Sequence, residues 1–329
     1  MNITILGAGA WGTALAVTLG VRHRVTLWAR DAAQVARMRA ERRNARYLPE
    51  IGLPADVMLD ADFGSACTSA ELLLLAVPVA GLRELCVQLR AAGSAAPLVW
   101  LCKGFEQTSG LLPHQLVAET LGSARSDRGA LSGPSFALEV ARGLPCALTL
   151  AAGDQAFARR TALALHGGRL RVYFSTDLTG VEIGGAVKNV LAIAVGISDG
   201  MGLGQNARAA LITRGLAEIA RLGAACGAQP ETIMGLTGAG DLILTATGDL
   251  SRNRRVGVEL AGGRSLNEIL ASLGHVAEGV RSAKEVQALA LRLRVDMPIT
   301  RAVNAVLDGR ATAAAALEAL LARDPREES

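Results

Sequence analysis

The chain has 329 residues, of which half are apolar and 19% are charged, and its formal net charge is +4. This length is enough for two domains, because single cores rarely grow beyond ~250–300 residues. Acidic and basic residues are mixed along the whole chain and aromatic residues make up only 3% of it. We therefore exclude a nucleic-acid-binding protein, which needs a basic stripe with stacking aromatic side chains.

Cysteine and histidine usage argues against a disulfide framework and against a metal site. The five cysteines and four histidines are scattered, and no two cysteines have Cys-x-x-Cys spacing. The first seven residues lack the basic start of a signal peptide. The longest apolar stretches, Leu72–Ala80 and Val190–Ile197, are shorter than the ~20 residues of a membrane span. We expect a cytoplasmic protein without metal and without a membrane span.

The first half of the chain alternates short apolar runs with helical patterns. This alternation predicts a doubly wound, mostly parallel α/β sheet in a Rossmann-like domain of residues 1–180. The expected strands are Ile3–Leu6, Val25–Trp28, Val57–Leu59, Leu72–Val77, Leu98–Cys102, Ala147–Leu150 and Leu170–Phe174. The expected helices are Thr13–Leu19, Asp31–Arg42, Leu82–Leu89 and Leu111–Leu121.

The pattern changes near residue 180, after which helical periodicity dominates. We predict an all-helical second domain of residues 181–329. Ser265 and Glu268 have the spacing of a capping box, which marks a helix start. The expected helices are Val181–Ile197, Ala207–Leu222, Arg254–Ala261, Ser265–Ser272, Ala283–Leu291 and Ala311–Ala322.

A glycine-rich segment, Gly7-Ala8-Gly9-Ala10-Trp11-Gly12, follows the first expected strand and opens the first expected helix. In this context it predicts a dinucleotide site. The first glycine permits a tight turn, the second lets a pyrophosphate approach the backbone, and the third lets helix and strand pack closely. Free amides at the helix start then bind the anion, and we expect Trp11 to line the cofactor.

The end of the second strand indicates which dinucleotide is bound. NAD-selective sites usually carry an acid there, whereas this chain has Ala29 followed by Arg30. A guanidinium can pair with a 2′-phosphate, so we predict a preference for NADP(H), with NAD(H) also possible. Asp31 keeps the NAD alternative open, unless it is the N-cap of the next helix.

Lysine is rare in this chain: only three of the 34 basic Lys and Arg residues are lysines. A retained lysine indicates chemistry that arginine cannot perform, because lysine can lose its proton near neutral pH. Lys103 follows a strand end, where ligands of such sheets bind. Lys188 lies among apolar and small residues on a helix, where it could protonate a carbonyl oxygen that accepts hydride. Lys284 is expected on a solvated helix face.

An ordered set of motifs resembles one family, the bacterial-type NAD(P)-dependent glycerol-3-phosphate dehydrogenases. The set covers about residues 3–300, so it is far more specific than any one motif. It comprises Gly7-x-Gly-x-Trp-Gly-Thr13, Asn44-x-x-Tyr47-Leu-Pro49, Val77-Pro78, Lys103-Gly104, Gly133-Pro-Ser-Phe-Ala137, Lys188-Asn189, Thr213-Arg-Gly215, Gly238-Ala-Gly-Asp-Leu242, Ser251-Arg-Asn253 and Glu278-Gly279. Ala246 and Val79 depart from the family pattern, away from the expected chemistry.

The resemblance implies substrates, dihydroxyacetone phosphate and sn-glycerol 3-phosphate, and a role for each matching residue. Lys188 would be the general acid/base, and Asp241 would hold the substrate hydroxyl or orient Lys188. Asp241 could also be a helix N-cap. Substrate contacts are implied for Lys103, Gly133, Ser135, Ser251, Arg252 and Asn253, and an indirect contact for Thr245. Cofactor contacts are implied for Gly7, Gly9, Ala10, Trp11, Gly12, Arg30, Lys103, Ala137, Arg252, Val276 and Glu278.

Two other classes of function are compatible with part of this pattern. Another two-domain dehydrogenase, of the hydroxyacid or phosphogluconate type, would also pair such domains, but Ser251-Arg252-Asn253 favours a phosphorylated triose. A non-catalytic dinucleotide sensor would not need the lysines or Asp241. A homodimer is the expected assembly, since it is the commonest for soluble enzymes.

Overall fold

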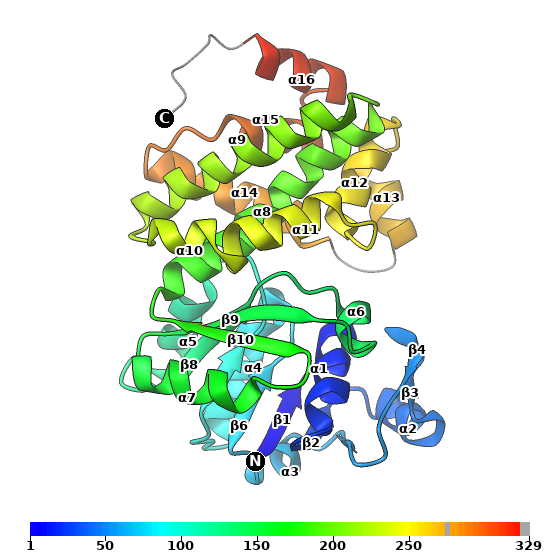
Figure 1. Cartoon of the computed structure of the whole chain (residues 1–329), viewed down its shortest axis with the longest axis vertical. Coiled ribbons are helices and arrows are strands. Elements are labelled where there is room, and N and C mark those ends of the chain that lie inside the picture. Colours follow the sequence, from blue (N-terminus) through cyan, green and yellow to red (C-terminus); the bar gives the residue numbers. More distant parts are fainter. Residues whose placement is uncertain (274–276, 323–329) are drawn as a thin grey trace. The chain divides into compact units, whose positions relative to one another are not determined.

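The computed structural model describes residues 1–273 and 277–322. The chain divides into two compact units. The N-terminal unit comprises Met1–Glu106 and Leu111–Glu182, and the helical unit comprises Gln107–Gly110 and the chain from Ile183. Figure 1 labels the elements of both.

The N-terminal unit is built on an eight-stranded sheet in the order β10-β9-β8-β7-β6-β1-β2-β5 (Figure 1). All neighbouring strands are parallel except β8 and β9, which confirms the doubly wound, mostly parallel fold. The strand order reverses beside β1, so the carboxyl ends of β1 and β6 flank the position where such sheets bind ligands. The strands are β1 (Asn2–Leu6), β2 (Arg24–Trp28), β5 (Met58–Asp60), β6 (Leu72–Leu75), β7 (Leu98–Trp100), β8 (Arg128–Ser132), β9 (Cys146–Ala152) and β10 (Leu170–Ser175).

Both faces of this sheet are covered, which explains why its central strands are apolar throughout. In β6, Leu72 and Leu74 join one hydrophobic cluster, whereas Leu73 and Leu75 join another. Successive side chains of a strand point to opposite faces, so a strand buried on both faces has no polar position. The helices of this unit are α1 (Ala10–Gly20), α2 (Ala32–Glu41), α3 (Phe63–Thr68), α4 (Val79–Ala91), α5 (Pro113–Leu121), α6 (Ala137–Ala141) and α7 (Gln155–Leu165).

Several elements of this unit were not predicted. A small antiparallel pair, β3 (Arg43–Asn44) and β4 (Leu48–Gly52), lies outside the main sheet. Strand β8 was missed because it opens with Arg128 and Gly129, which have low strand propensity. Gly129 is nevertheless required there, since a Cβ at this position would lie 2.5 Å from the Ala151 carbonyl oxygen.

The described residues of the helical unit, 107–110, 183–273 and 277–322, form no strand. The expected capping box is present, because Ser265 N donates to Glu268 Oε2 at 2.9 Å and Glu268 N donates to Ser265 Oγ at 3.4 Å. The helices are α8 (Leu178–Gly200), α9 (Gly204–Ala225), α10 (Pro230–Met234), α11 (Asp241–Thr247), α12 (Arg252–Ala261), α13 (Leu266–Leu273), α14 (Glu278–Arg292), α15 (Pro298–Leu307) and α16 (Ala313–Leu321), with a π-helical turn, η1 (Leu236–Gly240).

Helix α8 is longer than the apolar stretch that the sequence suggested. It is the one described helix long and apolar enough to cross a membrane, and its most apolar window is completely buried within the protein. Close packing accounts for this burial. A Cβ at Gly196 would lie 2.0 Å from the Arg254 carbonyl oxygen, and one at Gly257 would lie 2.1 Å from that of Ile193. The small residues thus let α8 and α12 pack with their backbones in contact.

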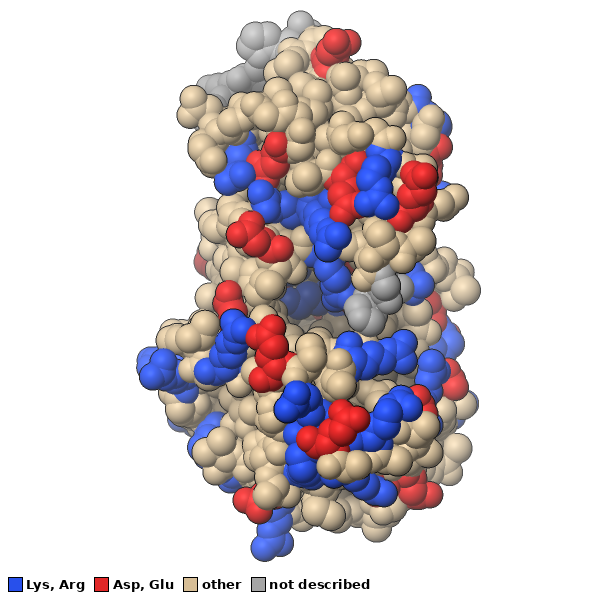
Figure 2. Space-filling view, turned by 90° about the vertical axis from the view of Figure 1, so that its right-hand side faces the viewer, with Lys and Arg blue, Asp and Glu red and all other residues tan. Residues whose placement is uncertain are grey.

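Charged side chains of both signs lie on the viewed face of each unit (Figure 2). In the helical unit, Arg208 and Arg254 both pair with Asp199, at 2.8 and 2.7 Å, and Arg255 pairs with Glu259 at 2.7 Å. These three arginines therefore have acidic partners within the unit.

Candidate active site

The turn between β1 and α1 has the geometry of a dinucleotide-binding loop. Gly7 has φ +125°, and a Cβ there would lie 2.5 Å from the Ala76 carbonyl oxygen. A Cβ at Gly12 would lie 2.0 Å from the Gly7 carbonyl oxygen, so this position holds helix and strand together. In contrast, a Cβ at Gly9 meets no atom within 4 Å. Gly7 and Gly12 thus allow close packing of the backbone, and Gly9 leaves open space beside it. This is the arrangement that a pyrophosphate site requires, so the residues fit a dinucleotide.

Two side-chain amides fix this loop from outside. Gln34 Nε2 and Asn44 Nδ2 each donate to the Ala8 carbonyl oxygen at 3.0 Å, and Asn44 Nδ2 also donates to Thr13 Oγ1 at 2.7 Å. Asn44 is buried at the start of the β3–β4 pair. No role was predicted for Gln34, and Asn44 was predicted only as part of a family motif.

The end of β2 is followed by an exposed arginine and by an aspartate that caps the next helix. Arg30 is exposed directly after the buried Ala29. The Asp31 carboxylate accepts hydrogen bonds from the amides of Ala33 and Gln34, at 2.9 and 3.2 Å, so it is the N-cap of α2. Asp31 therefore has the N-cap role that the sequence analysis left open. Ala10 and Trp11 open α1 and are half-buried.

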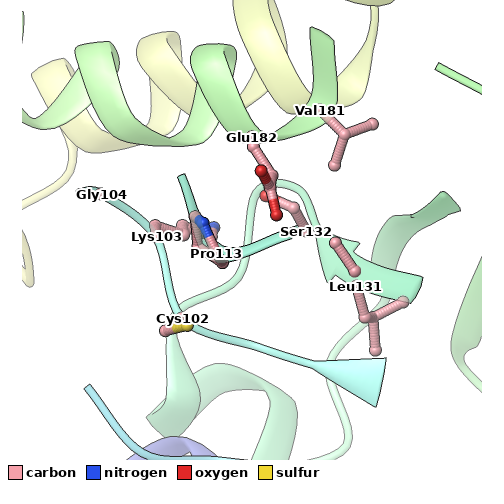
Figure 3. Close-up of a pocket in the computed structure, with 9 residues that line it drawn as sticks. Cys102, Lys103, Gly104, Pro113, Leu131, Ser132, Val181 and Glu182 are labelled. Carbon is pink, nitrogen blue, oxygen red and sulfur yellow. The ribbon is translucent and has the colours of Figure 1, made fainter. Parts of the chain in front are cut away.

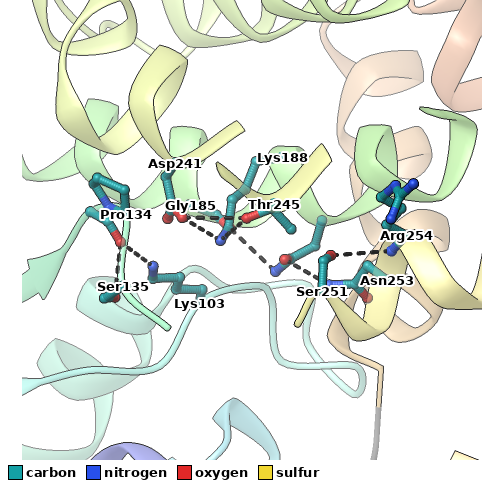
Figure 4. A network of polar contacts seen from close by, with 12 residues as sticks. Lys103, Pro134, Ser135, Gly185, Lys188, Asp241, Thr245, Ser251, Asn253 and Arg254 are labelled. Carbon is teal, nitrogen blue, oxygen red and sulfur yellow. Dashed lines mark hydrogen bonds and ion pairs between the residues drawn. The ribbon is translucent and has the colours of Figure 1, made fainter. Parts of the chain in front are cut away.

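Lys103 lies in the segment between β7 and α5, and its ammonium donates to the Gly133 carbonyl oxygen at 3.0 Å (Figure 4). Ser135 Oγ donates to the same oxygen, also at 3.0 Å. Gly133 has φ +137°, which a residue with a side chain would adopt only with strain. The structure therefore brings together Lys103, Gly133 and Ser135, with Ala137 at the start of α6.

Lys188 is buried in the helical unit and forms an ion pair with Asp241. Its Nζ donates to Asp241 Oδ1 at 2.6 Å and to Thr245 Oγ1 at 2.8 Å (Figure 4). The two residues are 7% and 1% exposed, so water screens the pair little. Gly184 makes the arrangement possible, because a Cβ there would lie 2.7 Å from the Thr237 carbonyl oxygen of η1.

Asp241 is not the N-cap of its helix. It is the first residue of α11, and Gly240 before it already has helical dihedral angles. Its carboxylate bonds to Lys188 and accepts a longer bond from Thr245 Oγ1 at 3.4 Å. The alternative of a capping role is wrong, and the side chain is oriented by the lysine.

Ser251, Arg252 and Asn253 open α12. Ser251 Oγ accepts from the Arg254 amide at 3.2 Å, which makes it the N-cap, and Arg252 is exposed. The buried Asn253 is tied to the protein: its Nδ2 donates to Asn189 Oδ1 at 2.9 Å, and its Oδ1 accepts from the Gly279 amide at 3.0 Å. Asn253 thus joins α8, α12 and α14, a function that the sequence did not reveal.

Two expected cofactor contacts remain. Glu278 is half-buried at the first position of α14. Val276 lies outside the described residues. No group of three or more His, Cys, Asp or Glu side chains that could hold a metal ion is found in residues 1–273 and 277–322.

Buried groups away from these clusters have shifted pKa values. Burial raises the pKa of Glu218, although the amides of Ile299 and Thr300 stabilise its carboxylate. Burial also raises the pKa of Cys67 to about 11 and that of Cys86 to about 12. These two thiols therefore stay protonated at neutral pH and behave as core residues.

Comparisons with known proteins agree with this geometry. A family model for the NAD-dependent glycerol-3-phosphate dehydrogenase N-terminus matches residues 2–158, and one for the C-terminus matches residues 177–318. A glycerol-3-phosphate dehydrogenase [NAD(P)+] from Dechloromonas aromatica is 60% identical over 328 residues, covering 100% of this chain and 99% of its own. One from Methylibium petroleiphilum is 60% identical over 332 residues, covering 100% and 98%.

Among solved structures, the glycerol-3-phosphate dehydrogenase from Coxiella burnetii has a TM-score of 0.93 and 40% identity. The match covers 98% of this chain and 99% of that one. Sequence, fold and clustered residues thus lead to the same family. The chain belongs to the NAD-dependent glycerol-3-phosphate dehydrogenases and is a nicotinamide-dependent oxidoreductase.

Proposed function

We propose that this enzyme reduces dihydroxyacetone phosphate to sn-glycerol 3-phosphate, with NADPH as the preferred reductant and Lys188 as the general acid. The observation that carries the proposal is the buried Lys188–Asp241 pair, with 2.6 Å between Nζ and Oδ1. A buried ion pair costs desolvation energy and is weak evidence for stability, which favours a catalytic reason for this lysine.

In the proposed reduction, the protein supplies the proton that the product oxygen receives. Bound nicotinamide would supply the hydride. The carbonyl oxygen that receives electrons becomes basic, and the Lys188 ammonium stabilises its charge and donates the proton. In the oxidation direction the neutral amine takes the proton back. Asp241 and Thr245 hold Nζ in one orientation, so the proton donor is positioned before the substrate arrives.

The phosphate would be held by charge and by amides. Arg252 is exposed at the start of α12, where a guanidinium and the positive end of a helix both attract a phosphate. Asn253 fixes the position of this helix start through Asn189 and Gly279. Ser251 lies beside it as N-cap, while Lys103, Gly133 and Ser135 would contact the substrate from their own cluster.

The cofactor would be bound by the loop of Gly7, Gly9 and Gly12, with Ala10 and Trp11 beside it. Arg30 would pair with the 2′-phosphate of NADPH, and Asp31 caps α2 through its Oδ1. Ala137, Glu278, Lys103 and Arg252 complete the contacts that we propose. The family resemblance supports a cytoplasmic homodimer that provides glycerol phosphate for phospholipid synthesis.

The proposed specificity is tested by following the absorbance of the reduced nicotinamide in three reactions. We expect rapid oxidation with dihydroxyacetone phosphate, slower oxidation when NADH replaces NADPH, and little with unphosphorylated dihydroxyacetone. Loss of the phosphate removes several charge-assisted hydrogen bonds, so kcat/KM should fall by at least ~10²-fold. Equal rates for the two ketones would contradict the phosphate site.

A further inference from the structure

Another buried carboxylate belongs to Glu182, which lies in the first turns of α8 and is the last residue of the N-terminal unit. Three hydrogen-bond donors surround it. Its Oε1 accepts from Trp100 Nε1 at 2.7 Å and from the His114 amide at 2.9 Å, and its Oε2 pairs with His114 Nδ1 at 2.5 Å. The Glu182 side chain is 3% exposed. A carboxylate this deeply buried is stable only because its donors replace water.

These donors lie at the two ends of one segment. Trp100 is the last residue of β7, and His114 is the second residue of α5. The chain between them, residues 101–112, carries Lys103. A single carboxylate therefore joins the point where this segment leaves the sheet to the point where it enters the helix.

The middle of the segment is held separately. Arg83 of α4 donates two hydrogen bonds to the Glu106 carboxylate, both at 2.7 Å, and the Glu106 amide donates to the Leu111 carbonyl oxygen at 2.9 Å. Lys103 lies between this anchor and the β7 end. Its backbone position thus depends on how firmly that end is held.

Glu182 and Lys103 also line the same small cavity (Figure 3). Cys102, Gly104, Pro113 and Ser132 share it. A movement of the Glu182 side chain would therefore change the space beside the Lys103 segment directly. Burial alone lowers the pKa of His114, but the hydrogen bond and the charge of Glu182 outweigh it and raise that pKa.

We propose that Glu182 is a positioning residue for the reaction, which fixes both ends of the segment 101–112 through Trp100 and His114 and thereby places Lys103. This inference rests on the proposed substrate contact of Lys103. It assigns to Glu182 no contact with substrate or cofactor. Its effect should therefore reach the substrate only through Lys103, and the glycine loop should be unaffected.

The kinetic test compares Glu182→Ala with Glu182→Gln. For Glu182→Ala we expect kcat/KM for dihydroxyacetone phosphate to fall about tenfold or more, because displaced binding groups lose their alignment. The dissociation constant of NADPH should stay within about twofold of wild type, since the glycine loop is intact. Glu182→Gln keeps an acceptor for Trp100 and a partner for His114, so it should recover most of the loss.

Glu84→Ala is the matched control. Glu84 is an exposed acid on α4 of the same unit, where it accepts a hydrogen bond from Gln88 of the same helix at 3.4 Å. Its kcat/KM should equal that of wild type. If Glu182→Ala fails to fold, Trp100→Phe removes one donor and puts a smaller aromatic ring in place of the indole, and it should raise KM. Full activity in the folded Glu182→Ala and in Trp100→Phe would overturn the proposal.

A second readout does not depend on the substrate. Hydrogen exchange of the amides in residues 101–112 should be about tenfold faster in Glu182→Ala than in wild type, and unchanged in Glu84→Ala. Unchanged exchange in Glu182→Ala overturns the positioning role even if activity falls. Faster exchange with a wild type that does not reduce dihydroxyacetone phosphate would instead reject the proposed function and leave the anchoring of the segment intact.

Discussion

At the scale of single residues, loss of the buried Lys188–Asp241 pair should reduce kcat and stability far more than loss of the exposed Lys284–Asp308 pair. Asp241→Asn leaves a buried ammonium without its counter-charge, which costs about 3–5 kcal/mol of unfolding free energy or forces the lysine to lose its proton. We expect kcat to fall by about 10²-fold or more. Both quantities are measured by steady-state kinetics and urea unfolding.

The control is Asp308→Asn. Asp308 pairs with Lys284 at 3.1 Å, but that lysine side chain is 71% exposed. Surface ion pairs contribute less than about 1 kcal/mol, so kcat and stability should hardly change. Equal effects of the two substitutions would show that burial of the Lys188 pair has no functional consequence.

Arg30 should determine the preference between the two dinucleotides. Arg30→Gln removes the proposed partner of the 2′-phosphate, so kcat/KM with NADPH should fall about tenfold or more, whereas kcat/KM with NADH should change little. The measurement is the ratio of kcat/KM with NADPH to kcat/KM with NADH, under identical conditions, in wild type and in the variant. Equal losses with both cofactors would place the selectivity elsewhere.

The sequence predicted the residues whose chemistry is unusual for this chain. Lys103 and Lys188 were evident because almost all other cations are arginines. Glu182 and Asn253 were not predicted as anchors, because their partners Trp100 and Gly279 lie far away along the chain. An acid within an apolar helix was the one available signal for Glu182.

At the scale of elements, different glycines of the loop between β1 and α1 should serve stability and cofactor binding. Gly12→Ala would place its Cβ 2.0 Å from the Gly7 carbonyl oxygen, so we expect a loss of about 2 kcal/mol or more in unfolding free energy. Gly9→Ala has open space for its methyl group and should unfold like wild type. It should nevertheless weaken NADPH binding about tenfold or more, because the pyrophosphate passes there.

Fluorescence titration with NADPH and urea unfolding distinguish the two variants. Normal NADPH affinity in Gly9→Ala would mean that the cofactor does not approach this backbone. Unchanged stability in Gly12→Ala would contradict the contact between α1 and β1.

The His114–Glu182 pair should make the N-terminal unit more stable at low pH. Glu182 raises the pKa of His114 in the folded state above 6.5 despite the opposing effect of burial. The stabilisation is therefore complete below pH 6.5 and is lost as the pH rises through the folded pKa. The stability difference between wild type and His114→Asn should shrink over this range.

Tryptophan fluorescence is suited to this measurement, because Trp11, Trp28 and Trp100 all belong to the N-terminal unit. A stability difference that stays constant from pH 5.5 to 8.5, a range of about one to two units around the free histidine pKa, would contradict the charged pair.

Elements were predictable where periodicity alone decides them. The continuous leucines of β6 and the long apolar pattern of α8 are examples. The π-helical turn η1 was not predictable, because it depends on Gly238 packing against α10, where a Cβ would lie 1.9 Å from the Ile233 carbonyl oxygen. Strand β8 depends likewise on a tertiary contact, that of Gly129 with Ala151.

At the scale of the whole molecule, the order of elements determines the fold class. Strands and helices alternate through β10, and helices follow to α16, so the sheet fold and the helical fold are each contiguous apart from the short segment Gln107–Gly110. The family motifs are distributed over both units. Each unit therefore contributes its own part of the proposed chemistry, the cofactor loop and Lys103 in one, Lys188 and Arg252 in the other.

The central claim is that Lys188 supplies the proton. The most direct measurement follows NADPH absorbance with dihydroxyacetone phosphate for wild type, Lys188→Ala and Lys284→Ala, with folding and NADPH binding verified for each. We predict rapid turnover by wild type and Lys284→Ala, and a loss of about 10³-fold or more in Lys188→Ala. A folded Lys188→Ala variant with wild-type turnover would contradict the claim and make Lys103 the better candidate for the acid.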